Sequence, residues 1–172
     1  MPVLPQLSPI FFLIALSICM VWVVISDARH YVISNLLNAV LLGLYVLAAL
    51  VLPLHPLSAV AAAAAVMVIG LGLFALGLMG GGDIKLLAVL SLWTGWSAAT
   101  PRFIFLTTLA GGILVVVVLL MRAALPPLWI RLCPKRNLPR LLTRKQPVPY
   151  GIAIAGAFAW LLWTGQVAGL HH

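Results

Sequence analysis

The sequence predicts an all-α, polytopic membrane protein with six transmembrane helices and both termini on the extracytoplasmic side. Apolar residues make up 65% of the 172 residues and charged residues only 7%, whereas a soluble domain carries roughly 25% charged residues. The apolar residues form continuous blocks, each about as long as a helix that crosses roughly 30 Å of hydrocarbon. Continuous blocks favour helices over the alternating strands of a membrane barrel.

The apolar blocks place the six spans at about residues 8–26, 36–52, 57–79, 84–99, 103–121 and 150–168. No basic segment or A-x-A cleavage site accompanies the first block, so we expect a retained span rather than a removed signal peptide. The second block stops at Pro53, because proline interrupts a helix. The third contains Gly70, Gly72 and Gly77, small residues that let helices approach closely in lipid.

Glycine, proline and basic residues mark the boundaries of the remaining spans. The fourth block is short and follows the glycine-rich segment MGGGDIK, and Pro101 opens the fifth. A basic, proline-bearing loop at 122–149 precedes the last span. We interpret residues 1–172 as a single transmembrane domain.

The positive charges predict the orientation of the spans. Nine of the ten Lys and Arg residues fall in the regions after the first, third and fifth spans, and Arg102 alone falls on the other side. The positive-inside rule makes the nine-residue side cytoplasmic, including the loop at 122–149. The only acidic residues, Asp27 and Asp83, are then predicted at the cytoplasmic ends of the first and third spans, on one side and at one depth.

The two carboxylates are candidate catalytic groups. An ionised carboxylate near hydrocarbon costs at least ~2–3 kcal/mol, and such residues usually have a function. Two adjacent carboxyl groups share one proton, so the ionised member can take a proton from water while the neutral member hydrogen-bonds the carbonyl of the bond to be cut, as in aspartic proteases. Alternatively, Asp27 and Asp83 could cap helices or pair with Arg29 and Lys85.

Gly80, Gly81 and Gly82 directly precede Asp83. Three glycines are expected to break the helix and to let another backbone come close, so that an opened, extended substrate could be held by main-chain hydrogen bonds. The alternative is a tight turn in which Asp83 is the N-cap of the fourth span. Lys85 lies two residues beyond Asp83 and would not face it on a helix, so headgroups or substrate are its expected partners.

Several other classes of site and partner are not predicted. Cys19 and Cys133 are far apart and form no C-x-x-C pair, so we expect no zinc site, disulfide framework, metal or cofactor. The net charge of +8 is explained by cytoplasmic loops rather than by nucleic-acid binding. The loop at 122–149 sets orientation or, alternatively, binds acidic lipid or other proteins.

Three segments carry a resemblance to the type IV prepilin peptidases, a family of GxGD membrane aspartic peptidases. Residues 80–85, GGGDIK, match their G-x-G-D-x-K motif. Residues 27–35, DARHYVISN, resemble their first aspartate motif, with Ser34 where proline is common. Residues 149–151, PYG, resemble a further family feature. The resemblance extends from the first span to the last.

The resemblance implies a membrane aspartic endopeptidase with Asp27 and Asp83 as its catalytic pair. It implies cleavage of the leader of a prepilin or pseudopilin that carries a transmembrane helix, at the cytoplasmic face of the bacterial inner membrane. About eight residues separate the first two spans and C-x-x-C is absent, so the chain is similar to the short tight-adherence (Flp) form, which does not N-methylate its product. Site-shaping residues implied by the motifs are Gly80, Gly81, Gly82, Lys85, Asn35, Pro149 and Tyr150.

Two other functions compete with the peptidase. In a transporter or proton channel the aspartates would act as a relay, which predicts carboxylates near the middle of the bilayer rather than at span ends. In a structural membrane scaffold, replacing both aspartates by asparagine would be harmless. The oligomeric state, and which aspartate is the general base, are left open.

Overall fold

The computed structural model describes residues 4–132, 148–167 and 169–170. In these ranges the regular structure is entirely α-helical, which confirms the predicted fold class. The helices are α1 (Leu4–His30), α2 (Asn35–Val51), α3 (Pro56–Ala75), α4 (Gly81–Thr94), α5 (Ala99–Leu132) and α6 (Gly151–Trp163).

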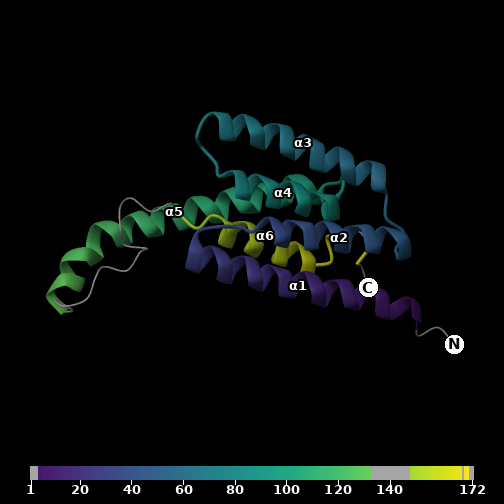
Figure 1. Cartoon of the computed structure of the whole chain (residues 1–172), viewed down its shortest axis with the longest axis horizontal. Coiled ribbons are helices and arrows are strands. Elements are labelled where there is room, and N and C mark those ends of the chain that lie inside the picture. The colour runs from purple at the N-terminus through teal and green to yellow at the C-terminus, as the bar shows by residue number, and fades with distance from the viewer. Residues whose placement is uncertain (1–3, 133–147, 168, 171–172) are drawn as a thin grey trace.

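Helix α4 is the centre of the bundle (Figure 1). It packs against α2, α3, α5 and α6, while α6 also packs against α1 and α5. Most α4 side chains from Ile84 to Thr94 are buried. Helix α3 lies at the outer edge with α4 as its main partner. The two helices that carry the aspartates, α1 and α4, both pack against α2 and α6.

Aromatic side chains fill the bundle between these helices. The Trp93 ring of α4 lies 5.5 Å from the Tyr45 ring of α2 and 6.1 Å from the Phe12 ring of α1, measured between centroids. Phe103 of α5 and Phe158 of α6 pack edge to face at 5.8 Å. Such pairs add about 0.5–1.5 kcal/mol each beyond the area they bury. They tie α1 and α2 to α4, and α5 to α6.

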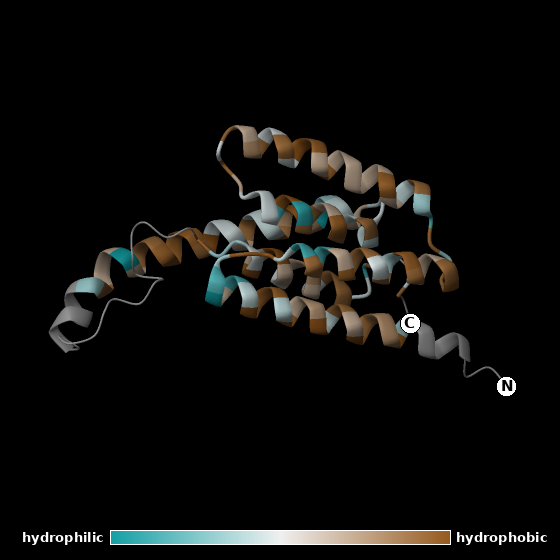
Figure 2. Cartoon of the chain, viewed as in Figure 1, coloured by the Kyte–Doolittle hydropathy of each residue, from teal (hydrophilic) through white to brown (hydrophobic). Residues whose placement is uncertain are grey.

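Hydrophobic residues predominate along the helices (Figure 2), and many of the large ones are exposed on the bundle. Leu50 and Leu57 are 77% and 86% exposed, which water would not favour but lipid does. Within the described residues, three helical segments are long and apolar enough to cross a membrane: Pro9–His30, Pro56–Ala75 and Ala99–Pro126. The chain is therefore a membrane protein. Helices α2, α4 and α6 are shorter, so six spans with both termini outside stay a prediction.

Two helices continue beyond the ends of the predicted spans. Helix α1 runs to His30 rather than stopping near 26, and α5 runs to Leu132 through the first part of the predicted loop at 122–149. Apolar blocks report where a chain leaves lipid, whereas polar helix formers such as arginine continue a helix into water. The remainder of that loop, 133–147, lies outside the described residues, and so do Cys133, His171 and His172.

Helix α3, in contrast, ends before the predicted boundary at 79. Gly77 adopts a φ of 69°, which favours glycine, and its N–H donates to the carbonyl of Phe74. The N–H of Leu78 donates to the carbonyl of Leu73 at 2.9 Å. This pair of bonds is the Schellman motif that closes many helices. It turns the chain from α3 into the glycine triplet at the start of α4.

Candidate active site

Asp27 lies in the last turn of α1 and is only 4% exposed. The helix ends just beyond it because Tyr31 adopts a φ of 56°, while the Tyr31 N–H still donates to the Asp27 carbonyl at 2.9 Å. The hydroxyl of Ser26 donates to the Val32 carbonyl at 2.9 Å and holds the turn closed. A left-handed backbone costs a non-glycine residue roughly 1–2 kcal/mol, so this turn is held by its surroundings.

The N-terminus of α6 meets the Asp27 carboxylate. The backbone N–H groups of Gly151 and Ile152 donate to it, and the positive end of the helix dipole favours a negative charge there. A methyl group placed on Gly151 would lie 2.9 Å from Asp27 Oδ2, so only glycine lets α6 approach this closely. Oδ2 itself is buried and has no hydrogen-bond partner among the described residues.

Asp83 is the third residue of α4 and is partly buried. Gly80 is the N-cap, with an extended backbone at φ −75° and ψ 143°, and its N–H donates to the Asp83 carboxylate. This is the returning half of a capping box. The expectation that the three glycines break the helix holds only for Gly80, since Gly81 and Gly82 are the first residues of α4. Asp83 is not the N-cap either, because the helix begins two residues before it.

The glycines give space rather than an extended edge. A methyl group on Gly80 would lie 2.9 Å from Asp83 Oδ2, and one on Gly82 would lie 3.5 Å from Ile33 Cβ. The triplet therefore lets the Asp83 side chain fold back over the helix start and lets the turn after α1 pack against it. This packing brings the end of α1, with Asp27, to the start of α4, with Asp83.

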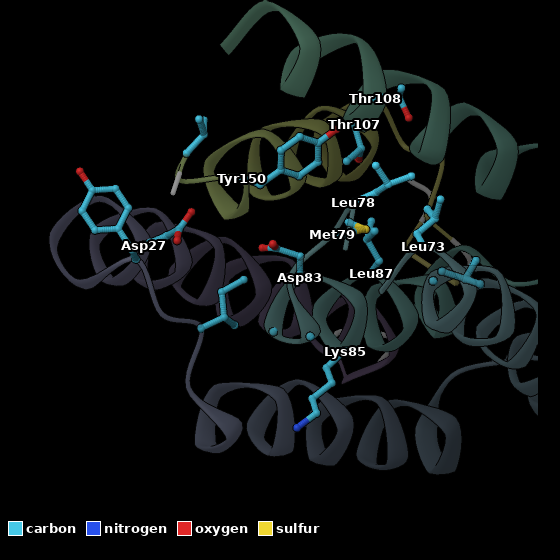
Figure 3. Close-up of a pocket in the computed structure, with 18 of the residues that line it drawn as sticks. Asp27, Leu73, Leu78, Met79, Asp83, Lys85, Leu87, Thr107, Thr108 and Tyr150 are labelled. Atoms are coloured by element: carbon cyan, nitrogen blue, oxygen red, sulfur yellow. The ribbon is translucent and has the colours of Figure 1, made fainter. Parts of the chain in front are cut away.

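One cleft of about 960 Å³ contains both aspartates (Figure 3). Figure 3 shows the Asp83 carboxylate on the side of α4 that faces Asp27 and Tyr150. The cleft wall is mostly apolar side chains of α3 and α5, with the glycine triplet at the start of α4. Of the site residues expected from the sequence, those that line it are Asp27, Asn35, Gly80, Gly81, Gly82, Asp83, Lys85 and Tyr150.

The electrostatics of the cleft couple the two carboxyl groups. Burial, and then the nearby Asp27 carboxylate, raise the pKa of Asp83 to about 6, against a weaker opposing effect of the Gly80 N–H. Asp83 directly precedes Ile84, the first residue of the predicted fourth span, and so lies outside that span. Both causes favour the protonated form of the Asp83 carboxyl group, because each makes its charged form less favourable.

Lys85 and Asn35, predicted separately, contact each other. The Lys85 Nζ donates to Asn35 Oδ1 at 3.1 Å, which joins the start of α4 to the first residue of α2. Ser34 is the N-cap of α2, and its hydroxyl accepts from the Leu37 N–H at 3.2 Å. Serine is a strong helix N-cap, which explains structurally why it can stand at this position. Lys85 thus positions the turn between α1 and α2.

Tyr150 and Pro149 lead into α6. Pro149 is buried, and the Tyr150 ring lies directly against Gly111 of α5, where a side chain would collide with it.

Sequence reasoning did not select Gly151, Gly111 or Thr107, which is a further cleft residue on α5. The glycine of the P-Y-G segment was the available signal for Gly151, whereas Gly111 and Thr107 stand in an apolar block that contains no motif. Among the described residues, no group of three or more His, Cys, Asp or Glu could hold a metal ion.

Comparison with known proteins agrees with this geometry. The profile of the type IV leader peptidase family matches residues 14–116, a segment that includes both aspartates. The chain belongs to the type IV leader peptidase family. Within this family, it is 38% identical over 91 residues to a prepilin leader peptidase/N-methyltransferase of Pseudomonas aeruginosa. No solved structure matches the chain.

The similarity to this leader peptidase covers part of each protein. It spans 52% of this chain and 24% of the relative, so the chain matches about a quarter of the length of that bifunctional protein. The α6 start, with Pro149, Tyr150 and Gly151, lies beyond the matched family segment at 14–116. Its place in the site is therefore a finding of the structure and not of the comparison.

Proposed function

We propose that this protein is a membrane aspartic endopeptidase that cleaves the leader of type IV prepilins or pseudopilins, with Asp27 and Asp83 as its catalytic pair. The observation that carries the proposal is the meeting of these carboxylates, one from the end of α1 and one from the start of α4, in a single cleft. Family membership supports the reaction class. The relative's printed name supports the substrate class.

The pair would act with one shared proton. The ionised carboxylate takes a proton from a water molecule, whose oxygen adds to the carbonyl carbon of the scissile peptide bond. The neutral carboxyl group hydrogen-bonds the carbonyl oxygen as negative charge develops there. The tetrahedral intermediate collapses when the carboxyl group that took the proton from water passes it to the amide nitrogen and the C–N bond breaks, which restores the singly protonated pair. Because the proton is shared, the roles of base and acid belong to the pair and not to either aspartate alone.

The apolar cleft suits a substrate that is itself a membrane helix. Such a segment has to open locally before its amide can be attacked, and the glycines beside Asp83 line the cleft without side chains that would obstruct its main chain. The charge distribution supports a site at the cytoplasmic face of the bacterial inner membrane, among membrane lipids. From the sequence resemblance we also propose an Flp-type substrate and release of the product without N-methylation.

Processing in cells tests this function. The protein is co-expressed with an Flp-type prepilin, and conversion of prepilin to the shorter mature form is followed by a gel shift. Wild-type protein should convert it, and Asp27→Asn and Asp83→Asn should each abolish conversion while still inserting in the membrane. Normal conversion by either variant would overturn the catalytic pair, and Asp-dependent proton flux in liposomes without cleavage would favour a proton relay.

A further inference from the structure

A second unpaired polar atom lies in the wall of the cleft. Among the described residues, the buried side chains with unpartnered polar atoms are those of Asp27, Asn38, Tyr45, Trp93 and Thr107. Of these, only Asp27 and Thr107 line the cleft. Thr107 is 3% exposed, and burying a hydroxyl without a partner is unfavourable. A molecule that enters the cleft could therefore supply the missing hydrogen-bond partner of Thr107 Oγ1.

The orientation of the Thr107 hydroxyl differs from that of its neighbour. Hydroxyls on helices commonly donate to the carbonyl four residues back. Thr108 does so, to Ile104 at 2.8 Å, as does Ser91, to Leu87 at 2.8 Å. Thr107 Oγ1 makes no such bond. Its hydrogen-bonding capacity is not used by its own helix.

The surroundings of Thr107 place it beside the proposed chemistry. It stands one helical turn before Gly111, on the α5 face that the Tyr150 ring contacts. Tyr150 lines the same cleft as Thr107 and the two aspartates. Figure 3 shows Thr107 and Tyr150 on the same side of the cleft. The other α5 residues that line the cleft are Ile104 and Val115, which are apolar, and Thr108, whose hydroxyl is bonded to its own helix.

We propose that Thr107 is a substrate-positioning residue whose hydroxyl hydrogen-bonds the main chain of the substrate segment opened beside Asp83. This inference rests on the proposed function. A locally unwound membrane helix exposes N–H and C=O groups that lose their intrahelical partners, and an apolar wall cannot replace them. A main-chain contact is independent of the substrate's side chains. Thr107 would thus hold different leader sequences in the same register.

Adjacent threonines offer a matched test. Purified full-length wild type, Thr107→Val, Thr107→Ser and Thr108→Val are compared on a purified prepilin in mixed micelles, with Asp83→Asn as the inactive reference. Thr107→Val should lower kcat/KM about five- to tenfold, the effect of one lost hydrogen bond. Thr107→Ser should stay within about twofold of wild type because it keeps the hydroxyl. Thr108→Val should behave as wild type, since its hydroxyl is bonded to its own helix.

The outcomes separate the two proposals. An unchanged Thr107→Val, or a Thr107→Ser variant as impaired as Thr107→Val, would overturn the positioning role while wild-type cleavage keeps the peptidase. An equal loss in Thr108→Val would likewise overturn it, because general loosening of α5 would then explain the effect. Failure of the wild type to cleave would overturn the peptidase proposal and this inference with it.

Discussion

The position of the Asp27 carboxylate depends on Gly151, which faces it across the α1–α6 contact. The Gly151 and Ile152 N–H groups bond its carboxylate, while Oδ2 stays buried without a partner among the described residues. A buried carboxylate oxygen without a hydrogen-bond partner is unfavourable unless water or substrate donates a hydrogen bond to it. The N-terminus of α6 therefore holds the Asp27 carboxylate in place, with the unpartnered Oδ2 lying against Gly151.

Replacing Gly151 should disturb this arrangement directly. In Gly151→Ala the new methyl group would lie 2.9 Å from Asp27 Oδ2 and 3.1 Å from Ile33 Cδ1, so the carboxylate has to move. We expect a roughly 10–100-fold loss of prepilin cleavage, because small misplacements of catalytic groups have effects of that size. Cleavage rates of the purified variant measure it.

Gly156→Ala is the matched control, since it stands on the same helix and a methyl group there has nothing within 4 Å. Its activity should equal that of the wild type. Equal activity of Gly151→Ala and Gly156→Ala would show that the Asp27 carboxylate is not constrained by α6.

Helix α3 is held against the first turn of α4 by a glycine contact. A methyl group on Gly70 would lie 2.5 Å from Ile84 Cγ2, the residue that follows Asp83. Gly70 thus lets α3 form one wall of the cleft while α4 carries Asp83. The same contact ties the position of Asp83 to a helix whose main partner is α4.

Gly70→Ala should overpack this contact and lower the free energy of unfolding by about 1–3 kcal/mol. Thermal unfolding in detergent measures the loss. Gly72→Ala, two residues along the same helix and with nothing within 4 Å, should instead be neutral or stabilising by about 0.5–1 kcal/mol. A Gly70→Ala variant as stable as Gly72→Ala would contradict the close α3–α4 packing.

Sequence patterns foretold the helices better than their ends. Hydropathy located each helix that the structure describes, but it could not show that α1 continues past Asp27 to His30, since polar residues continue a helix outside lipid. The G-x-G-D pattern marked Asp83 but not its helical state, because glycine permits both extended and helical backbones. Gly111 and Thr107 were not foreseen, because their roles come from the packing of α6 across α5.

The asymmetry of charge over the whole molecule predicts that both aspartates open to the cytoplasm. Trp96, which is 67% exposed between α4 and α5, is then extracytoplasmic, and His30 at the end of α1 is cytoplasmic. In a Cys133→Ser background, an impermeant maleimide should label Trp96→Cys in spheroplasts and His30→Cys only after permeabilisation. The reverse pattern would contradict the orientation, and buried Cys19 should stay unlabelled in both.

The meeting of Asp27 and Asp83 in one cleft is the basis of the account, and a double-mutant cycle on cleavage tests it most directly. Single-turnover rates are measured for Asp27→Asn, Asp83→Asn and the double variant, each purified and folded. Groups that act as one unit are strongly non-additive, so each single change should lower the rate by roughly 10⁴ or more and the double variant should be no slower than the slower single. Losses that multiply, or a single variant that cleaves normally, would contradict a catalytic pair.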